Sequence, residues 1–262
     1  MHRSILPIVT LVLAASARAA ISIGGLAIVG YQDNGTPDNF SFVALENIAA
    51  GEVIYFTDNG WTGSAYRTAS ATDGDGNESL IKFATNNPIL AGRVISSVGA
   101  GADFTWTITG LVPGGTIGSF NNLSLSTSGD QIYAFQGPLS LPLQNVTNHI
   151  YVLDTTVGFE LATDNATGAI TPGLSTAAYT AVTGFTPGGT FGLNPAASAV
   201  AALQSSGGTG AQWLQVIADP TNWVSGSQPA GPLNVIAVPE PSSTVLLLAA
   251  LGLVAARRRA RR

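Results

Sequence analysis

Between residues 21 and 236, short apolar runs alternate with turn signals, and long amphipathic repeats are absent. The runs are rich in Val, Ile, Phe, Tyr, Trp and Thr, the residue types that favour strands. We predict strands at residues 26–31, 40–45, 53–57, 80–83, 94–98, 104–108, 131–135 and 150–153. Many short strands at this spacing predict an all-β fold with a single β-sandwich-like domain.

The segments between these runs carry residues that make tight turns. They are Asp33-Asn34-Gly35, Asp58-Asn59-Gly60, Asp73-Gly74-Asp75-Gly76 and Pro113-Gly114-Gly115. Residues 111–118 and 184–192 are similar to each other, which fits either an internal duplication or two similar turns that lead into strands.

Helical periodicity is confined to residues 196–203 and 211–218, near the C-terminal end of the domain. The second segment places Trp213, Leu214, Val216 and Ile217 near one face. We expect this helix to cover a sheet edge.

The first 19 residues have the three parts of a secretory signal peptide. His2 and Arg3 precede an apolar run at 5–15, and Ala17-Arg18-Ala19 supplies the small residues that signal peptidase requires. The run is too short for the alternative, a transmembrane anchor. We therefore predict cleavage before Ala20 and an extracellular β-rich domain over residues 20–236.

Residues 237–262 have a second targeting pattern. Pro239-Glu240-Pro241 is followed by a small polar spacer and an apolar stretch at 245–256. These twelve residues would span only ~18 Å as a helix, against a hydrocarbon core of ~30 Å. The terminal arginines would stop a short transmembrane helix on the cytoplasmic side; they are Arg257, Arg258, Arg259, Arg261 and Arg262.

The order Pro239-Glu240-Pro241, short apolar helix and arginine cluster resembles the PEP-CTERM sorting tail of Gram-negative bacteria. That resemblance implies recognition by an exosortase, a membrane transpeptidase-like enzyme that cuts near the tripeptide and releases or re-attaches the protein at the outer surface. Hosts of such proteins commonly make exopolysaccharide and biofilm. The alternative is an ordinary C-terminal membrane anchor.

Charge and cysteine content narrow the function of the domain. Between the two ends, three bases (Arg67, Lys82 and Arg93) stand against fourteen acidic residues. Such a domain repels phosphate backbones, so we expect no nucleic-acid partner. The chain has no cysteine, which excludes disulfides, thiolate metal sites and a cysteine nucleophile.

A second resemblance covers most of residues 26–224. It rests on residues 40–45 and 48–61, on Phe104-Thr105-Trp106, and on residues 125–131 and 219–223. This pattern resembles a recurrent bacterial extracellular module whose opening is similar to lamin-tail-like β-sandwich domains. The module occurs alone on sorted surface proteins or beside secreted enzymes, and the resemblance implies no catalytic residues.

Catalytic motifs are weak in this sequence, and we predict no catalytic residue. His149 is the single histidine after the signal segment, and no Gly-x-Ser-x-Gly elbow is present. We interpret His149 as a surface turn residue. Ser79 and Lys82 have Ser-x-x-Lys spacing, which β alternation explains equally well. Asp33 with Asp58 would form a glycosidase pair only at a separation of ~5–10 Å.

In the acidic turn 73–78, Asp73, Asp75 and Asn77 stand on alternate positions with glycines between them, and Glu78 follows. Oxygen ligands on a bent loop suit Ca²⁺, the one cofactor that the sequence suggests. A solvated acidic turn is the alternative. A fall in melting temperature on addition of EDTA is expected if Ca²⁺ binds, and an unchanged value would remove the hypothesis.

Asp58, Asn59 and Trp61 form a candidate carbohydrate contact, to which Tyr66 and Trp106 could add. An exposed tryptophan beside Asp and Asn can stack on a sugar ring while its neighbours bind hydroxyl groups. The alternative is that Trp61 packs on the core after a turn.

Taken together, the sequence predicts an exported, non-catalytic surface or matrix protein that is held for a time at the inner membrane. Its expected partners are signal peptidase, an exosortase-like sorting enzyme, the membrane through the C-terminal helix, and envelope polysaccharide. The mature domain would be periplasmic, at the cell surface or extracellular. The competing hypothesis is a secreted hydrolase that acts on polysaccharide with carboxylates alone.

Overall fold

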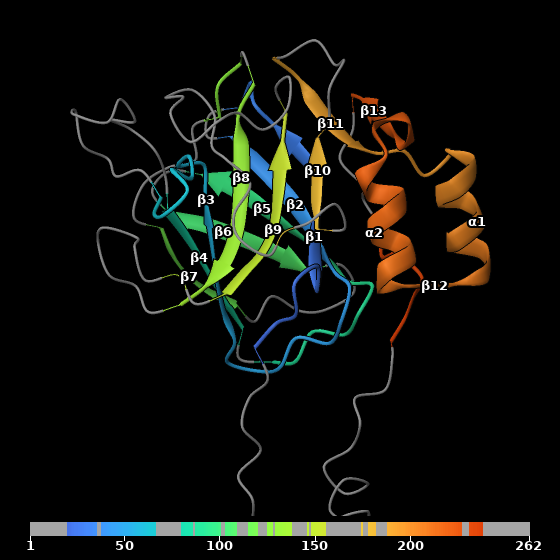
Figure 1. The fold of residues 1–262 in the computed structure, drawn as a ribbon, viewed down its shortest axis with the longest axis horizontal. Helices are drawn as coiled ribbons and strands as arrows, with labels where there is room; N and C mark the ends of the chain where they lie inside the picture. Colours follow the sequence, from blue (N-terminus) through green and yellow to red (C-terminus); the bar gives the residue numbers. More distant parts are fainter. Residues whose placement is uncertain are drawn as a thin grey trace, which may run out of the picture.

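The computed structural model of the chain is a two-layer β structure with two short helices at one side (Figure 1). It describes residues 20–35, 38–66, 80–85, 87–100, 103–108, 115–119, 125–127, 129–137, 146, 148–155, 174, 178–181, 188–226 and 231–237. The predicted all-β class and the helices near the C-terminal end are confirmed.

The first six-stranded sheet is antiparallel throughout. Its strands, in order, are β13 (Trp223–Ser225), β11 (Thr190–Leu193), β1 (Leu26–Gln32), β2 (Asn39–Ala44), β5 (Val94–Ala100) and β6 (Asp103–Ile108). The register between β1 and β2 shifts between Ile28 and Gly30, so a bulge interrupts this pair.

The second six-stranded sheet lies against the first (Figure 1). Its strands, in order, are β10 (Tyr179–Ala181), β9 (Asn148–Asp154), β8 (Gln131–Gln136), β3 (Val53–Thr57), β4 (Leu80–Thr85) and β7 (Gly115–Ser119). The pairs are antiparallel except for the short edge strand β10, which runs parallel to β9.

Aromatic side chains join the two sheets in the core. Phe56 on β3 lies 4.9 Å from Phe40 and 5.0 Å from Phe42 on β2, measured between ring centroids. Phe42 also meets Phe83 on β4 edge-on at 5.3 Å. All four rings are fully buried. Because a buried Phe stabilises a fold by ~1.5–3 kcal/mol, this cluster is a principal source of stability in a chain without disulfides.

The two helices α1 (Ser198–Ser206) and α2 (Gly210–Ala218) are followed by a single 3-10 turn, η1 (Pro220–Asn222). Helix α2 begins with a capping box of Thr209 and Gln212. It buries Trp213, Leu214 and Ile217, with Val216 half-buried. Such a cap and apolar face explain why this short segment is helical in a β-rich chain.

The end of α2 is tied to the edge of the second sheet, as the apolar face predicted. The carbonyl of Ile217 accepts hydrogen bonds from Thr180 Oγ1 on β10 (3.3 Å) and from Trp223 Nε1 (2.8 Å). Asn222 Nδ2 donates to the Val216 carbonyl at 2.9 Å. Because these side chains satisfy the last carbonyl groups of the helix, α2 can end inside the fold.

Strand prediction was correct at all eight predicted positions and missed the shorter strands. The similar segments 111–118 and 184–192 lead into β7 and β11, which lie in different sheets with different partners. A small third sheet pairs β12 (Gly208–Thr209) with β14 (Val235–Ile236). The signal segment 1–19 and the apolar stretch 245–256 lie outside the described residues. None of the described helices has the length and apolar character needed to cross a membrane.

Candidate functional sites at the two ends of the sandwich

The strands of the sandwich end in two chemically different regions. At one end, which we call the acidic end, β1, β3 and β9 finish and β2 and β8 begin. It holds five buried aspartates, Asp33, Asp38, Asp58, Asp130 and Asp154. At the other end, which we call the terminus end, β1 begins. The last described residues of the chain, Ile236 and Ala237, line the same pocket as the residues that lead into β1.

Two of these aspartates join loops that are distant in sequence. The Asp33 carboxylate accepts the backbone N–H groups of Gly188 (3.2 Å) and Gly189 (2.6 Å). The Asp38 carboxylate accepts those of Gly35 (2.8 Å) and Leu125 (2.7 Å). Burial raises the pKa of Asp38, and the N–H groups of Leu125 and Gly35 oppose that rise. Each carboxylate is therefore used as a structural acceptor.

Asp130 is a third buried acceptor at this end. Its carboxylate accepts the N–H groups of Ser126 and Gln131, both at 2.8 Å. Burial, followed by the nearby charge of Asp58, raises the pKa of Asp130 well above its usual value. Gln131 Nε2 donates to the Asp58 carbonyl. Like charges held out of water resist ionising together, which accounts for the direction of the shift.

Asp33 and Asp58, considered above as a glycosidase pair, lie at the same end of the sandwich, and both residues are buried. Both oxygens of Asp33 are engaged by backbone N–H groups. Within the described part of the chain, no group of three or more His, Cys, Asp or Glu side chains is arranged to hold a metal ion. The proposed calcium turn, Asp73, Asp75, Asn77 and Glu78, lies outside the described residues.

Trp61 belongs to a buried aromatic cluster on the second sheet. It pairs with Tyr66 in an isolated β-bridge, and their ring centroids are 5.0 Å apart. Trp61 is only 4% exposed, and Asp58 and Asn59 are buried as well. Asn59 Nδ2 donates to Thr57 Oγ1 at 2.7 Å. The expectation of an exposed sugar-stacking tryptophan is corrected, because the ring packs on the core as the alternative held.

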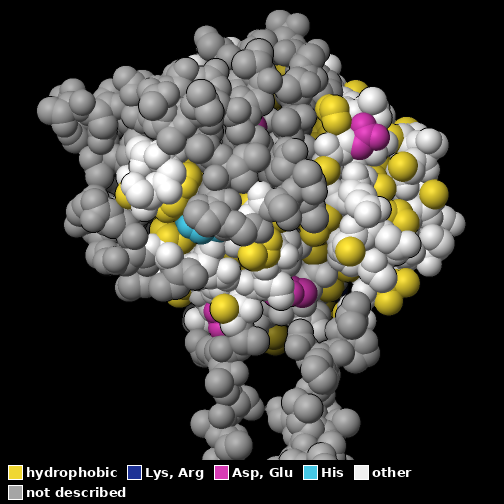
Figure 2. Space-filling view, viewed as in Figure 1, with side chains coloured by type: hydrophobic (Ala, Val, Ile, Leu, Met, Phe, Trp, Pro, Cys, Tyr) yellow, Lys and Arg dark blue, Asp and Glu magenta, His cyan; other side chains and the backbone are white. Residues whose placement is uncertain are grey.

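His149 completes this cluster, and it lies in a strand and not in the predicted turn. It lies within β9, its ring centroid is 4.7 Å from that of Trp61, and its Nδ1 is 3.3 Å from the Tyr66 hydroxyl. Figure 2 shows the histidine at the surface beside hydrophobic side chains. Burial lowers the pKa of His149 to about 4. The imidazole is therefore neutral at physiological pH and acts as a partly buried packing residue.

The described residues do not bring the remaining sequence candidates together. Ser79 lies outside the described residues, and Lys82 lies on β4 opposite Tyr55 and Gly118. Trp106 is on β6 of the first sheet, whereas Trp61 follows β3 of the second. The sorting residues Pro239, Glu240 and Pro241 and the arginine cluster lie beyond the described residues.

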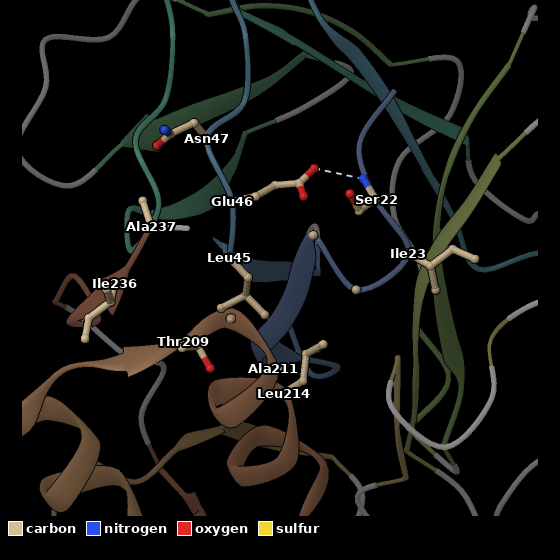
Figure 3. Close-up of a pocket in the computed structure, with 13 residues that line it drawn as sticks. Ser22, Ile23, Leu45, Glu46, Asn47, Thr209, Ala211, Leu214, Ile236 and Ala237 are labelled. Atoms are coloured by element: carbon tan, nitrogen blue, oxygen red, sulfur yellow. Dashed lines mark hydrogen bonds between the residues drawn. The ribbon is translucent and has the colours of Figure 1, made fainter. Parts of the chain in front are cut away.

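A pocket of about 460 Å³ opens at the terminus end (Figure 3). Four segments line it: the chain entry before β1, the turn after β2, the start of α2 and the end of β14. Its lining residues are Ser22, Ile23, Gly24, Gly25, Leu45, Glu46, Asn47, Thr209, Gly210, Ala211, Leu214, Ile236 and Ala237. Glu46 points across it to Ser22, whose backbone N–H it accepts at 2.8 Å.

The entering chain is fixed beside this pocket. Ile21 is buried, its N–H donates to Gln136 Oε1 at 2.9 Å, and its carbonyl accepts from Asn148 Nδ2 at 2.6 Å. Gln136 ends β8 and Asn148 begins β9, so the second sheet holds the start of the domain. The fold therefore begins one residue after the predicted signal-peptidase cut.

The C-terminal end of the described chain is also held by hydrogen bonds. We call residues 231–236 the C-terminal strap. Within it, the Leu233 N–H donates to the Gly92 carbonyl at 2.8 Å, and Asn234 accepts from Trp213 Nε1 at 3.1 Å through its carbonyl. Gly92 has φ +87°, and a Cβ there would lie 2.2 Å from the Leu233 oxygen. A glycine is required at position 92 for the strap to lie this close.

This pocket could not be predicted from the sequence pattern alone. Its residues come from four distant segments, and only the tertiary fold brings them together. One signal was available: the apolar Ile236 stands just before the sorting tripeptide, where a polar linker would be usual.

The fold and its termini define a two-sheet β-sandwich protein whose folded part extends up to a C-terminal targeting segment. Residues 237–262 match the family model described as the PEP-CTERM protein-sorting motif. The predicted sorting tail is thereby confirmed, and the motif supports export and processing by an exosortase-like enzyme. No curated protein and no solved structure matches the chain. The lamin-tail-like resemblance stays a prediction.

Proposed function

We propose that this protein is a non-catalytic component of the bacterial cell surface or extracellular matrix. An exosortase-like enzyme processes its temporarily anchored tail, and the mature β-sandwich associates with envelope or exopolysaccharide. The observation that carries the proposal is the sorting motif at 237–262, which begins directly after strand β14 of a folded two-sheet domain.

The buried carboxylates support a structural domain over an enzyme. Asp33, Asp38 and Asp130 each use both oxygens to accept backbone N–H groups. A carboxylate that acts on a glycosidic bond must reach the substrate, as an acid, base or nucleophile. Aspartates whose two oxygens are both bonded to backbone N–H groups of loops are poorly placed to reach a substrate.

Processing is tested by mass spectrometry of the surface-associated protein from its native host. We expect the mature chain to begin at Ala20 and to lack Arg257–262. A variant with Glu240→Ala should retain the tail, whereas Ser243→Ala, a matched change in the spacer, should be processed. Surface protein that keeps all five terminal arginines would contradict the proposal.

Association with polysaccharide is tested with the mature protein from the same host. Exopolysaccharide purified from that host should retain the protein in a sedimentation assay, and an unrelated neutral dextran should not. Equal recovery with and without the native polymer would remove the polysaccharide part of the proposal while leaving the sorting part intact.

The second candidate, a hydrolase that uses carboxylates alone, is favoured by one feature: at the acidic end, the nearby charge of Asp58 helps to raise the pKa of buried Asp130. It predicts release of reducing ends from exopolysaccharide by wild type and loss of that release in Asp58→Asn. The folded state of the variant is checked by its melting curve. No release by wild type rejects this candidate.

A further inference from the structure

We propose that the terminus end of the domain is the surface on which the sorting enzyme docks when it cuts the tail. The inference rests on the proposed function, because it takes an exosortase-like enzyme as the partner. Beyond that function, we infer that the enzyme binds the folded domain as well as the tail. The contact would involve the rim of the pocket and the exposed apolar side chains around it.

The first argument is the length of the connection. Ala237 lines the pocket, and Pro239 is only two residues further along the chain. Two extended residues span about 7 Å at most. An active site that holds Pro239-Glu240-Pro241 must therefore lie against this end of the sandwich.

The second argument is that the strap allows no extra length. Strand β14 pairs with β12 up to Ile236, and Asn234 is bound through its carbonyl and its side chain to Trp213 and Gln204. The Asn234 N–H also donates to Gln204 Oε1 at 3.0 Å. We call the connection from Ala237 to Pro239 the tether. It could lengthen only if several of these hydrogen bonds broke together, so the short connection is a fixed property of the folded domain.

The third argument is the chemistry of the surface. Among the described residues, the exposed large hydrophobic side chains are Ile23 (49%), Leu90 (57%) and Ile236 (52%). Ile23 and Ile236 line the pocket. Leu90 adjoins Ala91, whose N–H donates to Asn47 Oδ1 at 3.0 Å, and Asn47 also lines the pocket. Two of the three side chains thus line the recess, and Leu90 is next in the chain to a residue bonded to its rim. Exposed apolar side chains grouped in this way mark interaction surfaces.

These three features fit a partner that is held beside the membrane and presents apolar side chains to the recess. A lipid surface and a second copy of this chain are the other possible occupants. We commit to the sorting enzyme because its cleavage motif begins two residues after Ala237, whereas the apolar stretch that would enter lipid begins eight residues after it, at Val245. No comparable connection brings a second chain to this surface.

The proposal is tested by tail processing of the full chain in its native host. The double variant Ile23→Glu, Leu90→Glu changes no residue of the tail, and both side chains are exposed, so folding should be preserved. We expect cleavage at least about tenfold slower than in wild type. The matched control is Thr127→Glu, an exposed residue at the acidic end, which should be processed at the wild-type rate.

The two possible failures are distinguishable. If wild type itself keeps its tail and Glu240→Ala behaves identically, the proposed function fails. If wild type is cut in a manner that depends on Glu240 and the double variant is cut equally fast, only the docking surface is rejected. A melting temperature of the double variant within a few degrees of wild type excludes unfolding as the cause of slow cleavage.

A second measurement identifies the occupant directly. A photo-reactive amino acid at position 90 of the full chain should cross-link to the sorting enzyme in intact cells, and the same group at position 127 should not. Adducts at position 90 that contain only lipid, or only a second copy of this chain, would overturn the proposal, as would an equal yield of enzyme adduct at the two positions.

Discussion

The loops at the two ends of the sandwich are held together by different kinds of contact. At the acidic end, aspartate carboxylates accept backbone N–H groups from distant segments, as Asp38 does from Gly35 and Leu125. At the terminus end, an apolar pocket and the C-terminal strap bring four segments together around Leu45 and Leu214. One end is joined by buried carboxylates, and the other by amide and backbone hydrogen bonds around a recess with exposed apolar side chains.

This difference suggests a division of roles. Buried charge is specific and costly to disturb, so the acidic end is suited to fixing the fold. Exposed apolar surface is costly to leave in water unless a partner covers it, so the terminus end is suited to contact. The position of the sorting motif, next to Ala237, agrees with that division.

The largest expected effect is at Asp38. Asp38→Ala removes the acceptor of two N–H groups, one of them on buried Leu125, and should lower the free energy of unfolding by about 2–4 kcal/mol. Asp38→Asn retains one acceptor oxygen and should lose less. Urea unfolding curves give both values. A loss below 0.5 kcal/mol in Asp38→Ala would show that the acidic end does not depend on carboxylate acceptors.

Trp213 provides the corresponding test at the terminus end. Trp213→Phe removes the indole N–H that Asn234 accepts and leaves a void in a fully buried site, so we expect a loss of about 1–3 kcal/mol. The strap should open more readily than the sheets. Hydrogen exchange at the Leu233 and Gly208 amides should therefore quicken more than at Phe56. Equal changes at all three would mean that the strap has no independent opening.

The pH dependence of stability separates the buried groups. Because burial lowers the pKa of His149 to about 4, the unfolded chain binds a proton at higher pH than the folded chain does. The contribution of neutral His149 is therefore present above pH ~6.5 and is lost as the pH falls from ~6.5 toward ~4.

Asp130 acts in the opposite direction, because its raised pKa makes the folded state favour the protonated carboxyl as the pH falls. The difference between wild type and His149→Gln isolates the histidine. Allowing for its partial exposure, we expect a difference of about 1–2 kcal/mol to develop between pH 7 and pH 4. A constant difference across this range would contradict a buried neutral imidazole.

The smallest effect is expected for the docking residues themselves. Ile23→Glu should change the free energy of unfolding by less than about 0.5 kcal/mol, since the side chain is half exposed. Thermal melts of this variant and of Thr127→Glu should coincide with wild type. A large loss in Ile23→Glu alone would mean that Ile23 is a structural residue, and the comparison between the ends would need revision.

The sequence was most informative where short-range patterns decide the outcome. The strands predicted at 53–57 and 131–135 lie within β3 and β8 because alternating β-branched and aromatic residues between turns need little else to form strands. The apolar face of α2 was likewise a local pattern. The sorting tail was readable because its order of tripeptide, apolar stretch and arginines is itself a linear signal.

Other features depended on contacts between distant residues. Strand β10 has only three residues, pairs with β9 and is bonded through Thr180 to α2. No local sequence pattern predicts this strand. The sequence left the burial of Trp61 open and did not predict that of His149, because both depend on packing against Tyr66, which in turn packs on Tyr133. Polar residues next to a turn look exposed in sequence even when the fold encloses them.

The sequence by itself determined the β class, the positions of the main strands, and the sorting motif at the C-terminal end. Those properties depend on residues that are close along the chain. Only the tertiary structure decided that five aspartates share one end, that Trp61 is buried, and that Ile23 and Ile236 line one pocket. Such groupings join segments separated by many residues, and their formation depends on how the two sheets and the strap pack, which periodicity does not encode.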